Sequence, residues 1–117
     1  MNCCAKGESG KHWICFHAPS YGMLEWFDPL GKLPSAYNTA FPKFINRHSC
    51  VSFIYNSRNT QSLQSITCGL HCIFFIIHRS MGYSMNEILS SIYVSDIPDE
   101  CDAQVESFVQ SLFSEYL

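Results

Sequence analysis

Three short stretches rich in aromatic and β-branched residues predict strands. The first runs from Lys11 to Phe16, the second from Met23 to Phe27, and the third from Val51 to Tyr55. Pro19 and Gly22 lie between the first two and favour a chain reversal. We therefore expect the first two strands to pair as a hairpin.

Four further segments carry apolar residues at helical spacing. They are a short stretch within 32–49 around Pro42, the run Cys68–Ser80, a segment from Ser84 through Tyr93, and Asp102–Tyr116. Gly82 is suited to end the second helix, and Ser84 with Glu87 three residues later has the form of a capping box. The polar run Asn56–Ser65 predicts a loop, and the sum is an α+β fold.

Composition indicates one globular domain. The chain has 117 residues, of which 47% are apolar and 15% charged. A net charge of −3 gives no broad basic surface, so nucleic-acid binding is not indicated. The longest apolar run, Cys72–Ile77, is far shorter than the ~20 residues of a membrane span. Seven cysteines, an odd number, without a secretion signal predict a reducing intracellular compartment, the nucleus or cytoplasm.

Cys68 is the candidate nucleophile. A thiol attacks a carbonyl as thiolate, and Cys68 begins an apolar helix, where the positive end of the helix dipole favours that form. Gly69 leaves room for a substrate backbone to approach. His12 on the first strand is the candidate base. Asp28 closes the neighbouring strand, where hairpin pairing would bring it close enough to orient the imidazole.

A carbonyl under attack also needs donors for its developing negative charge. The backbone N–H of Cys68 is one candidate, and a side-chain amide of Gln61 or Gln64 in the preceding loop is the other. The residues alone leave the choice between these two glutamines open.

Three blocks of the chain resemble those of adenovirus-type cysteine proteases. They are Gly10–Trp13, Phe27–Gly31 and Gln61–Cys72, which correspond to the family's His-Trp, acidic-strand and Gln-to-Cys-Gly blocks. Within the family the chain is most similar to the proteases of Maverick/Polinton DNA transposons. Proteases of ubiquitin-like modifiers form a more distant branch with the same order of residues.

The resemblance implies a papain-like α+β fold whose catalytic helix packs on a twisted, mainly antiparallel sheet. It implies a cysteine-type endopeptidase with His12 as base, Asp28 as acid, Cys68 as nucleophile and Gln61 as oxyanion donor. Gln61 is preferred to Gln64 because it stands seven residues before the cysteine, a spacing typical of the family. Trp13 is expected to cover the base and pack in the core, and to bind substrate together with Gly69.

The implied substrates are viral or transposon-type precursor proteins, or in the alternative branch the tail of a ubiquitin-like modifier. No cofactor is implied, and the oligomeric state is not indicated. Family members carry a longer segment before the His-Trp strand, so residues 1–9 are expected to form a disordered tail and residues 10–117 a partial protease domain. The competing hypothesis is an inactive remnant that acts at most as a binding module.

Two other groups of residues fit structural roles better than functional ones. Cys68, His71, Cys72 and His78 are metal-ligand types, but no second pair at ligand spacing follows, so no metal site is predicted. Cys72 is expected to be buried beneath the helix. The acidic cluster Asp96, Asp99, Glu100 and Asp102 is expected to be a solvated loop between the last two helices.

Overall fold

The computed structural model describes residues 12–37, 40–49, 51–63 and 65–114, and the predictions for residues 1–9, Lys11 and Gln64 lie outside these ranges. The elements, in chain order, are β1 (Cys15–His17), β2 (Met23–Phe27), η1 (Pro34–Ala36), α1 (Ala40–His48), β3 (Ser52–Tyr55), α2 (Cys68–Ser80), α3 (Met85–Glu87), η2 (Ile88–Ile92) and α4 (Pro98–Ser114). The predicted α+β class is confirmed. No helix in the described ranges combines the length and the apolar character that crossing a bilayer requires.

The sheet has the order β1-β2-β3. β1 and β2 form the predicted antiparallel hairpin, in which Cys15 lies opposite Phe27. β3 runs parallel to β2, with Trp26 paired to Tyr55, so the predicted mainly antiparallel sheet is wrong and the sheet is mixed. The reason is the crossover through α1, which returns the chain to the starting end of β2 before β3 begins.

The first strand is shorter than predicted. β1 starts at Cys15, and Trp13 forms only an isolated bridge. The backbone of Trp13 is engaged elsewhere: its N–H donates to the Cys68 sulfur at 3.3 Å, and its carbonyl accepts from the Cys72 thiol at 3.5 Å. The chain before β1 is therefore fastened to α2.

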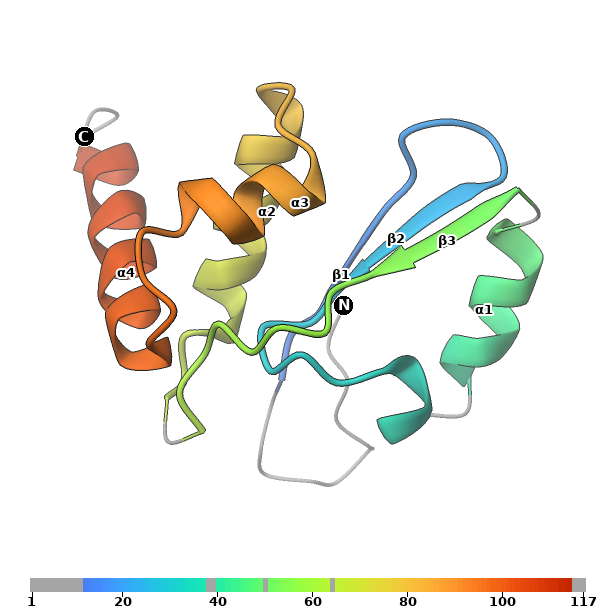
Figure 1. Ribbon diagram of the computed structural model, residues 1–117, viewed down its shortest axis with the longest axis horizontal. Helices are drawn as coiled ribbons and strands as arrows, with labels where there is room; N and C mark the ends of the chain where they lie inside the picture. Colours follow the sequence, from blue (N-terminus) through green and yellow to red (C-terminus); the bar gives the residue numbers. More distant parts are fainter. Residues whose placement is uncertain (1–11, 38–39, 50, 64, 115–117) are drawn as a thin grey trace.

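Two apolar layers cover the sheet, with α1 on one face and α2 on the other (Figure 1). Side chains of β2 alternate between them: Trp26 belongs to the cluster with Phe41 of α1, and Phe27 stacks on Phe75 of α2 with ring centroids 4.4 Å apart. The larger cluster continues from α2 into η2 and α4 through Ile88, Tyr93, Cys101 and Val105. The core therefore supports α2 from both sides along its length.

Local signals set the ends of the helices that follow. α2 spans the predicted residues and ends in a Schellman motif, in which Gly82 has φ +102° and the N–H of Tyr83 bonds to the carbonyl of His78. The capping box of Ser84 and Glu87 is present. The helix that it starts continues as a π-helical turn, η2, because the Tyr93 N–H bonds to the carbonyl of Ile88.

The prediction of a solvated acidic loop is wrong in part. α4 begins at Pro98, so Asp99 and Glu100 are helical, in a first turn where carboxylates complement the helix dipole. Asp96 does precede the helix and is exposed. Asp102 is buried at 9% exposure, because it faces the start of α2.

Candidate active site

The structure brings His12, Asp28 and Cys68 together from three segments. His12 lies just before the bridge residue Trp13, Asp28 follows β2 directly, and Cys68 is the first residue of α2. Nε2 of His12 is 2.5 Å from Oδ1 of Asp28. The imidazole also forms a side-chain hydrogen bond with the Cys68 thiol. The resulting order of thiol, imidazole and carboxylate is the arrangement of a nucleophile, a base and an orienting acid.

The contacts shift both protonation equilibria toward an ion pair. Burial alone would lower the pKa of His12, but the hydrogen bonds with Asp28 and Cys68 outweigh it and raise that pKa to about 9. Burial alone would raise the pKa of Cys68, yet the bonds with His12 and with the Trp13 N–H lower it below the ordinary thiol value. A thiolate beside an imidazolium is the reactive form of a nucleophilic cysteine.

Asp28 is completely buried and held by several donors. Its Oδ1 accepts from the backbone N–H of Leu30 at 2.9 Å, and its Oδ2 accepts from the N–H of Lys32 at 3.1 Å. These bonds form the Asx-type turn that the Asp-Pro-Leu-Gly segment favours. Gly31, at φ +73°, is required there, since a Cβ would come within 2.9 Å of the backbone of Ser57 and Arg58. The turn and the contact with His12 therefore use the same carboxylate.

Two residues that the sequence did not single out complete the surroundings of Asp28. The hydroxyl of Tyr37 donates to Oδ2 at 2.5 Å, and its ring stacks on His12 with centroids 5.7 Å apart. Asn56 accepts from the Asp28 N–H at 2.8 Å and donates to the Asp28 carbonyl at 2.6 Å. Asn56 directly follows a predicted strand, which is the one feature of the sequence that could have indicated its role. No local pattern marks Tyr37.

Trp13 lies differently from its prediction. Its side chain is 46% exposed, so the expectation that it packs in the core is wrong. It lines an apolar pocket of about 480 Å³ together with Gly69 and the side chains of Ile66, Leu70 and Ile73. Because Gly69 follows Cys68 directly, this pocket adjoins the nucleophile. Gly69 is close enough to Trp13 that a Cβ would contact the indole at 3.8 Å.

Gln61 is buried at 3% exposure in the loop before Cys68. Its side-chain nitrogen donates to the carbonyl of Ser65 at 3.0 Å, which folds the loop back on itself. Its side-chain oxygen has no hydrogen-bond partner within the described part of the chain. The role of Gln61 as oxyanion donor stays a prediction.

The metal-ligand residue types of α2 have other partners. His71 bonds to Asp102 and His78 bonds to the carbonyl of Phe74, both at 2.8 Å. Cys72 is half-buried, and hydrogen bonding to Cys15 together with burial raises the pKa of its thiol. Over the ranges that the structure describes, no group of three candidate ligands gathers at one point.

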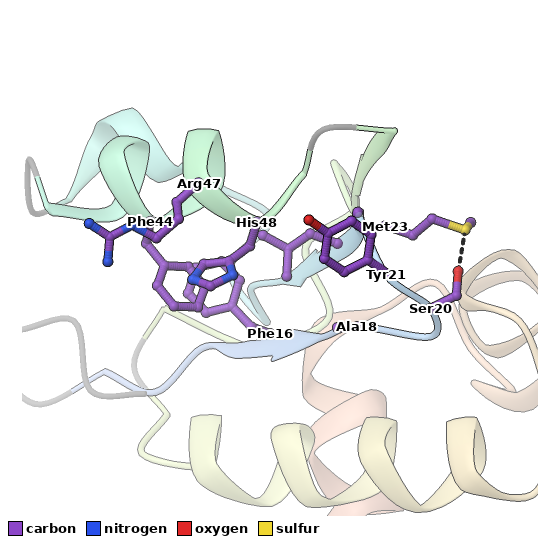
Figure 2. Close-up of a pocket in the computed structure, with 10 residues that line it drawn as sticks. Phe16, Ala18, Ser20, Tyr21, Met23, Phe44, Arg47 and His48 are labelled. Carbon is purple, nitrogen blue, oxygen red and sulfur yellow. Dashed lines mark hydrogen bonds between the residues drawn. The ribbon is translucent and has the colours of Figure 1, made fainter.

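A separate pocket of about 530 Å³ lies between the hairpin and α1 (Figure 2). The rings of Phe16 and Phe44, which both line it, contact each other with centroids 4.7 Å apart, and Arg47 and His48 stand on its α1 side. None of the site residues predicted from the sequence lines this pocket.

Comparisons with known proteins place the chain among viral proteases. The family model described as adenovirus endoprotease matches residues 1–111. A protease of bovine adenovirus 4 is 28% identical over 107 residues, which cover 79% of this chain and 53% of that protein. A protease of bovine adenovirus 7 is 33% identical over 111 residues, covering 81% and 54% respectively. No solved structure matches the chain.

The chain thus spans about half the length of the relatives it matches. The family match, in contrast, takes in His12, Asp28 and Cys68 and nearly all of the described elements. The chain belongs to the adenovirus endoprotease family.

Proposed function

We propose that this chain is a thiol-dependent endopeptidase domain, with Cys68 as nucleophile, His12 as base and Asp28 as orienting acid. One observation carries the proposal: the imidazole of His12 bonds to the Cys68 thiol and, 2.5 Å away on its other side, to a buried carboxylate. A thiol and a carboxylate on one imidazole are the partners that the base of a nucleophilic cysteine requires. The family match and the protease relatives support the same reaction.

The reaction follows from the ion pair. Since Nε2 of His12 contacts Asp28, Nδ1 is the ring nitrogen that takes the proton of the thiol. The Cys68 thiolate attacks the carbonyl carbon of the peptide, and a C–S bond forms as the carbonyl oxygen becomes an oxyanion. The C–N bond then breaks while His12 gives its proton to the leaving amine. Water, deprotonated by His12, hydrolyses the thioester and frees the thiolate.

The oxyanion requires donors at the start of α2. The backbone N–H of Cys68 is one of them, because the N-terminus of a helix presents N–H groups and partial positive charge. Gln61 is the second. Its side-chain NH2 group has two N–H bonds, of which one donates to Ser65, and the other is the proposed oxyanion donor. Both donors sit in or beside the short loop that ends at Cys68.

We propose that the substrates are viral or transposon-type precursor proteins. We also propose that the domain has the papain-like protease architecture. The protease relatives from adenoviruses support the precursor class. The apolar pocket beside Cys68 suits a substrate with an apolar side chain near the scissile bond. A free thiolate needs reducing conditions, so an intracellular site of action in the nucleus or cytoplasm is part of the proposal.

The first test is alkylation of the folded protein by iodoacetamide at neutral pH, with each cysteine followed by peptide mass mapping. Cys68 should react at least about tenfold faster than an exposed thiol, and His12→Ala should abolish the difference. Cys72→Ala is the matched control, since it removes a neighbouring thiol whose pKa is raised. A Cys68 that reacts at the ordinary rate would support the inactive remnant instead.

A further inference from the structure

A second buried histidine–carboxylate pair lies directly behind the candidate nucleophile. Asp102 of α4, which packs beside α2 (Figure 1), accepts three hydrogen bonds from the start of α2 and its preceding loop. Oδ1 accepts from the hydroxyl of Thr67 and from Nε2 of His71, both at 2.8 Å, and Oδ2 accepts from the N–H of Ser62 at 3.2 Å. One carboxylate therefore joins α4, α2 and the loop.

The protonation of this group is defined by its partners. Burial lowers the pKa of His71 although Asp102 opposes the shift, so the imidazole is neutral at pH 7. A carboxylate only accepts, hence Nε2 of His71 carries the proton. Nδ1 then accepts from the hydroxyl of Tyr93 at 2.8 Å. Every polar atom of the completely buried imidazole has a partner, which makes the pair a fixed support.

The same loop is fastened at its other end to the turn that holds the orienting acid. The N–H groups of Thr60 and Gln61 donate to the carbonyl of Pro29 at 2.7 and 3.1 Å, and Pro29 follows Asp28 directly. The loop therefore runs from a bond beside Asp28 to Cys68. Its geometry sets both the place of Gln61 and the direction of the Cys68 N–H.

Thr67 is where this support reaches the nucleophile. It is the N-cap residue of α2 and the immediate neighbour of Cys68, yet its side chain makes no capping bond to the helix. Its hydroxyl points to Asp102 and also contacts the hydroxyl of Ser65 at 2.5 Å. The side chain of an N-cap threonine normally accepts a hydrogen bond from a backbone N–H of the first helical turn. Here the hydroxyl of Thr67 bonds to α4 instead, so the helix lacks that stabilising bond.

We propose that Asp102 is a positioning residue, which holds Thr67 and Ser62 so that the Cys68 N–H and Gln61 point at the oxyanion of the reaction. This inference rests on the function proposed above. Asp102 should therefore affect the attack on a carbonyl, because that step needs the oxyanion donors. It should not affect the ionisation of the Cys68 thiol, because that depends on His12.

Two small probes separate these effects without knowledge of the peptide substrate. Iodoacetamide is attacked at a saturated carbon with loss of iodide, so its rate reports the thiolate alone. With p-nitrophenyl acetate, the thiolate attacks the carbonyl, an oxyanion forms, a C–S bond replaces the C–O bond and p-nitrophenolate leaves. Both rates scale with the thiolate fraction, so their ratio reports the oxyanion donors. Rates from Cys68→Ala are subtracted to remove the other thiols.

Asp102→Asn keeps the size of the side chain but turns an N–H group toward donors. We expect its acetylation rate to fall about tenfold or more while the alkylation rate changes less than about threefold. Asp99→Asn is the matched control, because Asp99 is an exposed carboxylate in the first turn of the same helix. It removes the same charge and should leave the ratio of the two rates unchanged.

Thr67 provides a second pair of variants in case Asp102→Asn does not fold. Thr67→Val loses the hydroxyl at equal size and should lower the ratio as Asp102→Asn does. Thr67→Ser retains the hydroxyl, so its ratio of the two rates should equal that of the wild type. Folding of each variant is checked by urea unfolding, since a purely structural role would change the unfolding midpoint without changing the ratio in the folded protein.

The outcomes are distinct. An unchanged ratio in Asp102→Asn or Thr67→Val overturns the positioning role while rapid, His12-dependent alkylation upholds the proposed function. A parallel loss of both rates assigns Asp102 a general structural role and also overturns the inference. If wild-type Cys68 is no more reactive than an exposed thiol, the proposed function fails and the positioning role fails with it.

Discussion

At the scale of single residues, the chemistry depends on how His12 is placed between two acidic groups. The pKa of His12 is raised to about 9 and that of Cys68 is lowered, so the proton of the thiol resides on the imidazole over the intervening pH range. Burial does not cause the thiolate–imidazolium pair, since burial disfavours both charged forms. It exists because each charge has a hydrogen-bond partner a short distance away.

The pH dependence of alkylation tests this pair. In the wild type, the iodoacetamide rate of Cys68 should rise on the acid side of the ordinary thiol pKa, because the thiolate forms early. His12→Ala should move the rise toward the alkaline side. Asp96→Asn, which changes an exposed carboxylate outside the site, is the control and should leave the profile in place. Coincident profiles for the wild type and His12→Ala would refute the ion pair.

Tyr37 allows its two contacts to be separated. Tyr37→Phe retains the ring stacked on His12 but removes the donor to Asp28, and we expect Cys68 to acetylate more slowly by less than about tenfold. Tyr37→Ala removes both contacts and should be slower still. Steady release of p-nitrophenolate measures the order of the three proteins. A Phe variant as fast as the wild type would show that the hydroxyl does not help to orient the acid.

At the scale of elements, a buried ion pair fastens the sheet to α2. Glu25 on β2 is 5% exposed and accepts from Nε of Arg79 at 2.9 Å and from Nη2 at 3.1 Å. Nδ1 of His17 on β1 lies 2.9 Å from the same carboxylate. A charged residue on an otherwise apolar strand face is tolerated because its lone pairs are satisfied.

Removing one partner should be costly. Arg79→Ala leaves the Glu25 carboxylate buried with less compensation, and we expect the free energy of unfolding to fall by about 3 kcal/mol. Urea unfolding followed by circular dichroism measures it. Arg47→Ala on the exposed side of α1 should change the same quantity by less than about 0.5 kcal/mol. If Arg79→Ala were as mild as Arg47→Ala, the ion pair would not stabilise the contact between the sheet and α2.

At the scale of the whole molecule, the sheet side and the helical side meet at the loop before Cys68. Bonds from Thr60 reach Pro29 next to the sheet, and bonds from Thr67 reach Asp102 on α4. Arg58 adds a further link, with its guanidinium bonded to the carbonyls of Leu89 and Ser95. The reactive groups come from both sides of this junction, so the junction decides their relative positions.

The buried His71 makes the junction sensitive to acid. Its pKa is lowered in the folded protein, so the unfolded chain binds the proton more readily. The free energy of unfolding should therefore fall as the pH drops below about 6.5, the ordinary value, toward the folded pKa. His12 has the opposite sign: its raised pKa adds stability at low pH that is lost as the pH rises through about 9.

His71→Gln isolates the acid-side effect. The substitution keeps a donor for Asp102 but cannot take up a proton, so the decline of unfolding free energy between pH 7 and pH 5 should be shallower than in the wild type. Urea unfolding at each pH provides the comparison. Equal slopes in the two proteins would mean that His71 does not couple its protonation to folding.

Much of this architecture was predictable because its causes are local. The extent of α2, its end at Gly82 and the capping box of Ser84 depend on neighbouring residues and on backbone sterics. The hairpin follows in the same way from a turn between two β-favouring segments. The residues predicted for the site, His12, Asp28 and Cys68, stood out because their chemical types and the family motif point to one reaction.

What escaped prediction depends on contacts between distant segments. The parallel direction of β3 follows from where α1 packs, and the exposure of Trp13 follows from a backbone held by the sulfurs of α2. Asp102 was predicted to be solvated with the other acidic residues near it, yet its position on α4 directs its side chain to His71.

The sequence by itself therefore determined most of the secondary elements, though not all of their ends, and the chemical identity of the reactive groups, since periodicity, caps and turn residues act over a few positions. Only the tertiary structure decided which polar side chains are buried and which partners they meet. Hydrogen bonds such as those of Tyr37 with Asp28 and of Asp102 with Thr67 form between residues whose spacing along the chain carries no signal. Their geometry exists only once the core has packed.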